Sequence, residues 1–294
     1  MVFLCYTILG DTMRKDAKRV KNINGMEQLM IDIKPSRADS DVFLKDDFDV
    51  TEMVKFIEKS KQEGKDYTYF HAFVTAIAKT IYNRPKLNRF IANRHVYEHN
   101  EVIVSFVAKV SFEDQAEEVM LLIPIELDDN IETIGKKITS KVKDIRENNV
   151  EKEGANSAID TLGKLPNIIR IPVVGLLKWM DNKGILPASL IKDNLYYSST
   201  IVTDIGTFGC SAIYHNITDF GACSSILAIG EVRDKEIIVN GKNKRIKVVD
   251  LGLNLDERIA DGFYFIKSAK YLKFFLSNPS TLEEAASKRY EIDD

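Results

Sequence analysis

The sequence has few of the residues that cross-link or break up a chain. Among its 294 residues are three cysteines (Cys5, Cys210 and Cys223), 15 glycines and 7 prolines. An odd cysteine count without a C-x-x-C pair argues against a disulfide framework and against a thiolate zinc site, so we expect a reducing, cytoplasmic setting. The modest glycine and proline content excludes collagen-like and low-complexity proteins.

Long apolar runs and an excess of one charge are absent as well. The longest apolar runs, such as 119–125, fall far short of the roughly 20 residues that a membrane-spanning helix needs. Lys and Arg number 41 against 44 Asp and Glu, a net charge of −3, so there is no overall basic field for nucleic acid. With 45% hydrophobic residues, the composition predicts a soluble globular protein with a sizeable core, no membrane span and no nucleic-acid partner.

Apolar periodicity predicts most of the regular structure. Apolar residues recur every three or four positions in 69–81, 131–146 and 263–276, which predicts helices. The apolar segment 165–190 is interrupted by prolines and predicts two short, kinked helices. Strands are expected at 101–110, 119–127, 196–203, 224–232, 236–239 and 244–255, with Asn240–Gly241 as a hairpin turn.

The irregular alternation of strands and helices indicates the fold class. It favours an α/β protein, a two-layer sandwich with a mixed β-sheet and helices packed on one face. Residues 10–40 are charged and lack sustained periodicity. We therefore expect an N-terminal arm over residues 1–40 that docks on something else, followed by one domain over residues 41–294.

Several common catalytic motifs are missing. The chain contains neither of the two glycine-rich phosphate loops, nor the G-x-S-x-G or H-E-x-x-H motif. Its histidines are His71, His95, His99 and His215. His95 and His99 have a metal-ligand spacing for a helix, but they lie in a stretch leading into a strand, so a solvated turn is favoured and no metal is expected.

Several motifs, in chain order, resemble those of one superfamily. Residues 254–263, N-L-D-E-R-I-A-D-G-F, are similar to the D-H-R-x-x-D-G signature of the chloramphenicol acetyltransferase superfamily. That superfamily includes the catalytic domains of the dihydrolipoyl acyltransferases of 2-oxo acid dehydrogenase complexes. Residues 203–209 (T-D-I-G-T-F-G) resemble its S/T-N-L-G-x-F-G, residues 226–232 its strand ending in G-x-V, and residues 85–88 its P-x-x-N. The resemblance spans residues 40–280 and is to stand-alone members without a lipoyl domain.

The resemblance implies a chloramphenicol acetyltransferase-like fold and a CoA-dependent acyltransferase. An acyl group would move between a thioester and a thiol or hydroxyl acceptor, with CoA or acyl-CoA as substrate, no bound metal and no attached lipoate. The family members are trimers with the active site between subunits. There, a motif histidine takes the acceptor's proton, and a Ser or Thr hydroxyl of the neighbouring subunit stabilises the oxyanion.

Carried over by position, the resemblance assigns four residues. Thr203 matches the hydroxyl donor, Arg258 the motif arginine, and Asp261 the aspartate that orients the motif through an ion pair, while Glu257 stands where the family has histidine. A carboxylate with a pKa of about 4.3 facing a thiol of about 8.5 makes proton transfer uphill by roughly 6 kcal/mol. Burial raises a carboxyl pKa, so Glu257 would be a workable base in a dry pocket, although a nearby arginine acts in the opposite direction.

Other interpretations remain open. The turn around Arg258 can be a salt-bridge network with Asp261 capping the last helix, and Thr203 can be an ordinary strand residue. His215 is a possible replacement base, although a turn histidine is favoured. Segment 165–180 can line an acyl channel or touch a membrane surface, but a subunit contact or core cover is favoured. The alternative to an acyltransferase is a catalytically impaired homologue that binds an acyl thioester or serves assembly.

Overall fold

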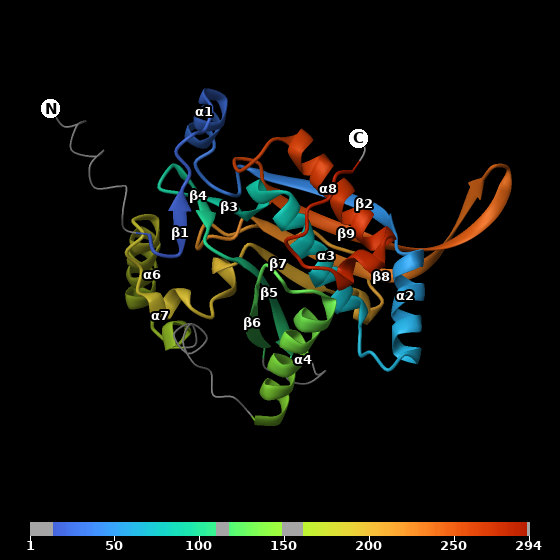
Figure 1. The fold of residues 1–294 in the computed structure, drawn as a ribbon. Coiled ribbons are helices and arrows are strands. Elements are labelled where there is room, and N and C mark those ends of the chain that lie inside the picture. The colour runs from blue at the N-terminus through green and yellow to red at the C-terminus, as the bar shows by residue number, and fades with distance from the viewer. Residues whose placement is uncertain (1–13, 110–117, 149–160, 293–294) are drawn as a thin grey trace.

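The computed structural model describes residues 14–109, 118–148 and 161–292, and Figure 1 shows their arrangement. The first part of the expected N-terminal arm, residues 1–13 with Cys5, lies outside the described residues. Cys210 is exposed and Cys223 is buried, and both are free thiols. No helix among the described residues is long and apolar enough to cross a membrane.

A six-stranded mixed sheet forms the centre of the molecule. Its strand order is β2-β9-β8-β7-β5-β6. Strand β7 pairs in parallel with β5 and with β8, and the other pairs are antiparallel. The strands are β2 (Asp41–Asp49), β5 (Val102–Lys109), β6 (Glu118–Ile125), β7 (Thr200–Asp204), β8 (Ser225–Val239) and β9 (Lys242–Asp256).

Helices cover one face of this sheet, as Figure 1 shows for α3 and α8. Their apolar side chains meet Val104, Val202 and Leu251 of the strands in the main core. Phe275 of α8 is fully buried there. The predicted two-layer α/β sandwich with a mixed sheet is therefore confirmed. The covering helices are α2 (Thr51–Gln62), α3 (Tyr69–Asn83), α4 (Ile131–Asn148) and α8 (Gly262–Ser277).

Residues near the N-terminus contribute one strand of a smaller sheet and one helix. Strand β1 (Ala17–Arg19) pairs with β4 (His95–His99), which pairs with β3 (Arg89–Ala92). Helix α1 (Gly25–Ile33) starts with a capping box. Its Ile31 is buried against the turn between β9 and α8. The described part of the expected arm thus packs on its own chain, and a domain boundary at residue 40 stays a prediction.

The second face of the large sheet is crossed by residues 209–224, which have no regular structure. Successive strand residues point to opposite faces, so Val202 contacts the helices while Ile201 packs with Ile217 and Cys223 of this crossing segment. Gly252 lets the segment approach, because a Cβ there would lie 2.6 Å from the carbonyl oxygen of Ile213.

Two motif glycines have a packing role. A Cβ on Gly206, in the short 3-10 helix η3 (Gly206–Phe208), would overlap the carbonyl oxygen of Gly230 in β8. A Cβ on Gly230 would in turn overlap a carboxylate oxygen of Asp250 and lie 2.7 Å from the amide nitrogen of Ala212. The two glycines therefore let η3, β8 and the crossing segment meet backbone to backbone.

The helices expected at 69–81, 131–146 and 263–276, the hairpin and several strands occur where they were expected, and three of the expected strands differ. The turn Asn240–Gly241 has φ of 51° and 74°, as a tight hairpin requires. The expected strands 224–232 and 236–239 are one strand, β8, with an irregular pairing between Ile229 and Val232. The expected strand at 196–203 begins as the 3-10 helix η2 (Leu195–Tyr197), and only β7 is extended.

The prediction of two short helices in segment 165–190 is half right. A short helix, α7 (Ala188–Ile191), follows α6 (Asn167–Asn182), but α6 runs through Pro172 for 16 residues. Pro172 lacks the N–H that would bond four residues back, so it removes a single helical hydrogen bond near the start of α6. The remaining 3-10 helices are η1 (Pro85–Asn88) and η4 (Pro279–Glu283).

Substitution of Gly206 by alanine should destabilise the fold through this backbone contact. We expect Gly206→Ala to lower the free energy of unfolding by about 1–3 kcal/mol, because the added methyl group forces η3 and β8 apart. Urea unfolding followed by circular dichroism measures the loss. Gly25→Ala is the matched control, because a Cβ at Gly25 meets no atom within 4 Å. Equal stability of the two variants would contradict the packing role.

Candidate active site

The C-terminal motif forms the turn between β9 and α8, and its arginine holds that turn. The Arg258 guanidinium donates to Asp256 through Nε (2.8 Å) and Nη2 (2.7 Å). The two side chains are 3% and 0% exposed. Nη1 of Arg258 also donates to the carbonyl oxygen of Lys34 at 3.0 Å. Arg258 therefore forms a buried ion pair that fixes the turn. This contact agrees with the interpretation of the turn as a salt-bridge network.

Glu257 is paired with a different cation. Its carboxylate forms an ion pair with the ammonium group of Lys34, and the two side chains are 28% and 30% exposed. Its backbone N–H donates to the carbonyl oxygen of Ser40 at 3.0 Å. The single chain therefore leaves Glu257 partly open to water, with a positive neighbour that stabilises the ionised carboxylate.

Asp261 caps the last helix. Its Oδ1 accepts the backbone N–H of Tyr264 at 2.8 Å, at the first turn of α8. The side chain is exposed. Asp261 is therefore the N-cap of α8 in the single chain, as the alternative interpretation of the motif expected.

Thr203 lies far from Glu257 within one chain. Thr203 pairs with Ala228, and Ala228 with Gly252 on the next strand, while Glu257 comes five residues after Gly252. With the usual rise per residue and spacing between strands, the two residues are about 19 Å apart. A site that uses both side chains therefore requires a second copy of the chain.

The residue after Thr203 also departs from the family pattern, because Asp204 stands in the place of asparagine. Burial raises the pKa of Asp204, against the opposing effect of backbone hydrogen bonds from Thr207 and Gly206. A raised pKa favours the protonated carboxyl group, which has one donor and one acceptor, as an amide side chain does.

His215 lies on the crossing segment, close to the strand that precedes the motif. Its backbone N–H donates to Oδ1 of Asn254 at 3.0 Å. Its Nε2 and the Nδ2 of Asn254 are buried without a hydrogen-bond partner among the described residues. The structure thus brings His215 next to Asn254, three residues before Glu257, but no contact with Glu257 is recorded in the part of the chain that is described. The sequence offered no signal for this placement, because the segment has no periodicity.

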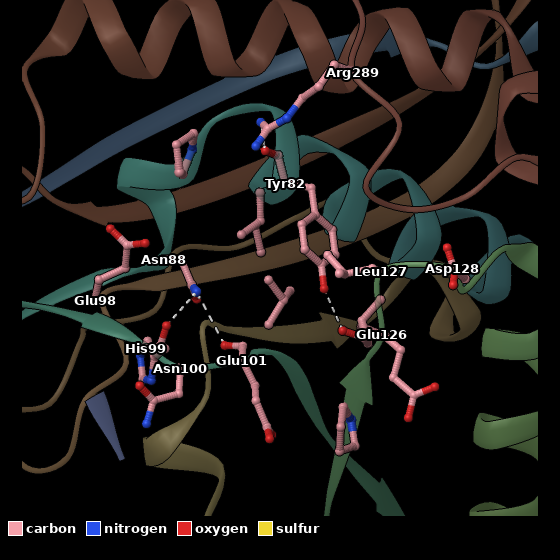
Figure 2. A pocket seen from close by; sticks show the side chains of 15 residues that line it. Tyr82, Asn88, Glu98, His99, Asn100, Glu101, Glu126, Leu127, Asp128 and Arg289 are labelled. Atoms are coloured by element: carbon pink, nitrogen blue, oxygen red, sulfur yellow. Dashed lines mark hydrogen bonds between the residues drawn. The ribbon is translucent and has the colours of Figure 1, made fainter. Parts of the chain in front are cut away.

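Asn88, from the P-x-x-N motif, is a structural residue. Its Nδ2 donates to the carbonyl oxygens of His99 and Glu101, each at 3.3 Å, and its Oδ1 accepts the Ser199 hydroxyl at 2.5 Å. Figure 2 shows the first two of these bonds at one side of a cavity. Asn88 therefore ties η1 to the β4–β5 turn and to the start of β7.

The cavity beside Asn88 has an acidic lining. It measures about 730 Å³ and is walled by α3, η1 and the turns that follow β4 and β6. Its lining includes the carboxylates of Glu98, Glu101, Glu126 and Asp128 and the guanidinium of Arg289, all labelled in Figure 2. An excess of negative charge repels an anionic substrate, and none of the four assigned site residues lines this cavity.

The two histidines with metal-ligand spacing do not form a metal site. Both lie on β4, where residues four apart are about 13 Å apart. No cluster of three metal-binding side chains occurs among the residues that the structure describes. The ring Nε2 of His99 instead donates to the carbonyl oxygen of Ala222 at 3.1 Å.

His99 is a neutral, buried imidazole. Burial lowers its pKa to about 4, and the charges of Arg14 and Arg37 act in the same direction, against the hydrogen bond to Ala222. Between its ordinary pKa of about 6.5 and this value, the unfolded chain binds a proton that the folded chain does not. Stability is therefore lost as the pH falls through this window.

The pH dependence of unfolding tests this assignment. We expect the stability of the protein to drop between pH 7 and pH 4.5 by about 2 kcal/mol more than that of His99→Gln, which keeps a donor toward Ala222 but has no proton to gain. The comparison is of the change with pH within each protein, measured by urea unfolding. Equal losses in the two proteins would show that His99 is not a buried neutral group.

The two ion pairs of the turn should differ in their effect on stability. Arg258→Met should lower the free energy of unfolding by about 3–5 kcal/mol, because it removes both guanidinium hydrogen bonds from the buried Asp256 carboxylate and leaves only Arg37, 4.0 Å away. Lys34→Met should lower it by about 1 kcal/mol or less, because its pair with Glu257 is partly exposed. Chemical denaturation measures both, and similar losses would contradict the different burial of the two pairs.

Comparison with known proteins agrees with the geometry. The family model for the 2-oxoacid dehydrogenases acyltransferase (catalytic domain) matches residues 188–283, which contain both Thr203 and Glu257. No curated protein matches the chain.

The whole described fold is similar to several solved structures. One is a probable dihydrolipoamide acetyltransferase from Listeria monocytogenes, with a TM-score of 0.58 and 18% identity, covering 89% of this chain and 95% of that one. The dihydrolipoamide acetyltransferase of Azotobacter vinelandii gives a TM-score of 0.58 at 13% identity, with 90% and 94% covered. A chloramphenicol acetyltransferase gives 0.53 at 11% identity, with 88% and 99% covered.

The predicted resemblance is thereby confirmed for the fold and for part of the sequence. The chain has the fold shared by chloramphenicol acetyltransferase and the catalytic cores of dihydrolipoamide acetyltransferases, and over residues 188–283 it carries the sequence pattern of the 2-oxoacid dehydrogenase acyltransferase catalytic domain.

Proposed function

We propose that this protein is a CoA-dependent acyltransferase whose active site forms where Thr203 of one copy meets Glu257 of another, in a homotrimer. The observation that carries the proposal is the separation of the two residues within one chain, about 19 Å by strand register. Two motifs of one catalytic domain that cannot meet in one chain can meet across a subunit boundary.

Exposed apolar side chains beside both residues support this contact. Phe208, just after β7, is 62% exposed. Phe263 and Ile266, at the start of α8 and close to Glu257, are 73% and 55% exposed. Clustered exposed apolar residues are typical of protein–protein contacts. A second copy would also exclude water from Glu257, which the single chain leaves partly exposed.

The chemistry assigns one role to each side chain. Glu257 takes the proton of the acceptor thiol or hydroxyl, and the resulting nucleophile attacks the thioester carbonyl. The Thr203 hydroxyl donates a hydrogen bond to the oxyanion that forms. The carbon–sulfur bond to CoA then breaks, and the leaving thiolate takes the proton back from Glu257. Lys34 pairs with the Glu257 carboxylate and positions it, and the ion pair of Arg258 with Asp256 holds the turn in place.

The spacing of the motif agrees with this assignment. In the Azotobacter vinelandii enzyme, a serine, and a histidine and an asparagine that lie four residues apart, have been investigated for their role in the mechanism. Here Thr203 takes the place of the serine, and Glu257 and Asp261, also four residues apart, take the places of the other two. We expect the protein to act in the cytoplasm on small-molecule donors and acceptors.

One observation favours a second candidate. A carboxylate paired with Lys34 is a weaker base than the family's imidazole, so a homologue that binds an acyl thioester without transferring the acyl group is the alternative. Calorimetric titration with CoA, combined with an acetyl-transfer assay, separates the two. Binding without turnover supports the alternative.

Subunit mixing tests the active site. We expect Thr203→Val to slow acyl transfer by about 100-fold, as loss of an oxyanion donor does, and Glu257→Gln to slow it by a similar factor. When the two variants are co-assembled in equal amounts, about a quarter of the interfaces of a cyclic oligomer carry both native residues. Activity should therefore return to about a quarter of the native value.

The control and the contradicting results are well defined. Oligomers of either variant alone should show no recovery of acyl-transfer activity. If the co-assembled variants form mixed oligomers but regain no activity, the proposal of an active site between two copies is wrong. If Glu257→Gln retains full turnover, Glu257 is not the base, and His215→Gln becomes the variant to measure.

A further inference from the structure

Helix α6 has large apolar side chains that the rest of the described chain does not cover. Figure 1 shows α6 at the side of the molecule away from the β8–β9 hairpin. Its Leu177 and Met180 pack on the buried cluster around Tyr97 and Leu186. Six other side chains of the helix are between 41% and 84% exposed: Ile168, Ile169, Ile171, Val174, Leu176 and Trp179. Core cover, one expected role of segment 165–180, is therefore confined to the inner side of α6.

These exposed residues form one broad face. Ile168, Ile171 and Trp179 lie at positions i, i+3 and i+11, which share one side of a helix. Leu177 comes nine residues after Ile168 and therefore lies on the opposite side, since a helix has 3.6 residues per turn. A helix that is apolar on both sides is usually buried on both sides. The outer face of α6 is thus a contact surface that needs a partner.

Positive charge surrounds this apolar face. The segment 161–193 has five cationic residues and two aspartates, whereas the whole chain has a net charge of −3. One of the aspartates, Asp181, is buried and paired with Arg14 at 3.0 Å. Four of the cations are exposed at or beside α6: Lys164, Lys178, Lys183 and Lys192. The partner that fits this surface is therefore both apolar and anionic.

A membrane surface with anionic lipids has both properties. Lysine is depleted in the core of protein–protein contacts, whereas anionic headgroups attract it. Trp179, beside Lys178, has the amphipathic ring that is enriched at the membrane–water interface. Helix α6 has 16 residues, fewer than the roughly 20 that cross a bilayer. It can instead lie in the plane of the interface, with its apolar face toward the acyl chains.

We propose that α6 attaches the protein to a membrane surface that contains anionic lipids. Ile168, Ile171 and Trp179 enter the upper part of the acyl chains, while Lys164 and Lys178 reach the headgroup phosphates. The attachment is independent of the proposed function, because none of the residues assigned to catalysis lies on α6. The exposed apolar residues that support a contact between copies also lie on other elements, so the two contacts do not exclude each other.

The only tryptophan of the chain, Trp179, lies on the proposed contact surface, so its fluorescence reports on that surface. The full chain is titrated with vesicles of equal parts phosphatidylcholine and phosphatidylglycerol. We expect a saturable shift of the emission to shorter wavelength, and quenching by lipids brominated on their acyl chains, because the indole leaves water. Vesicles of phosphatidylcholine alone should bind more weakly, since they lack the anionic headgroups.

Matched variants separate α6 from the rest of the surface. The double variant Ile168→Ser/Ile171→Ser should raise the apparent dissociation constant for these vesicles at least tenfold, because less apolar surface leaves water. Lys178→Glu should raise it at least fivefold, since it replaces attraction to the headgroups by repulsion. The controls are Ile238→Ser and Lys242→Glu on the β8–β9 hairpin, where both side chains are exposed, and each should change the constant less than twofold.

Two results in these titrations would overturn the proposal. One is native protein whose Trp179 emission neither shifts with the vesicles nor is quenched by brominated lipid. The other is equal vesicle binding by the double variant and by Ile238→Ser, since the apolar face of α6 would then play no part.

Two other occupants of the face have their own signatures. Residues 1–9 are mostly apolar, and Arg14 contacts Asp181 at the end of α6. If a chain that starts at Met13 shows at least twofold stronger acrylamide quenching of Trp179 than the full chain, the N-terminal residues cover the face and the proposal is overturned. A smaller oligomer in the double variant, measured by analytical ultracentrifugation, with vesicle binding unchanged, would assign the face to a second copy and would also overturn it.

Discussion

The buried charge cluster of Asp256, Arg258 and Arg37 is the interaction on which this part of the molecule depends. Arg258 reaches the carbonyl oxygen of Lys34, and Arg37 those of Thr218 and Gly221, so the cluster joins the motif turn, the segment before β2 and the crossing segment. Buried charges persist only when they are paired and hydrogen-bonded. Arg37 also lies 4.0 Å from the Asp256 carboxylate. Because three segments distant in sequence supply these partners, the position of Glu257 follows from one arrangement of charges.

The sequence predicted the layers of the fold but not the residues that shape its surface. Periodicity placed α3, α4 and α8, and Asn240–Gly241 placed the hairpin, because these features depend on neighbouring residues. The crossing segment, which has no periodicity, is held by distant groups such as Asp250 and Asn254. Pro172 suggested a break, yet α6 continues, because one missing hydrogen bond costs less than the remaining turns contribute.

Several residues of the motifs serve packing, and a sequence alone does not distinguish them from residues that serve chemistry. Gly206, Gly230 and Asn88 recur in the family pattern, and here each is explained by a close backbone approach or by hydrogen bonds between segments. Arg258 joins this group through Asp256. Thr203 and Glu257 have no comparable packing role among their described contacts, and the proposed function assigns these two side chains to the substrate.

The partner of Glu257 bears on how the motif came to hold a carboxylate. A lysine beside a histidine base would oppose the imidazolium that forms when the base takes a proton, because like charges repel. The same lysine beside a glutamate stabilises the anion before the proton arrives and has no charge to repel afterwards. In both cases the lysine weakens the base, but only with a glutamate do the two side chains form an attractive ion pair before the proton is transferred. In this turn the charge of Glu257 is therefore compensated by Lys34 of the segment that precedes β2, and the proposed base has to accept its proton against that attraction.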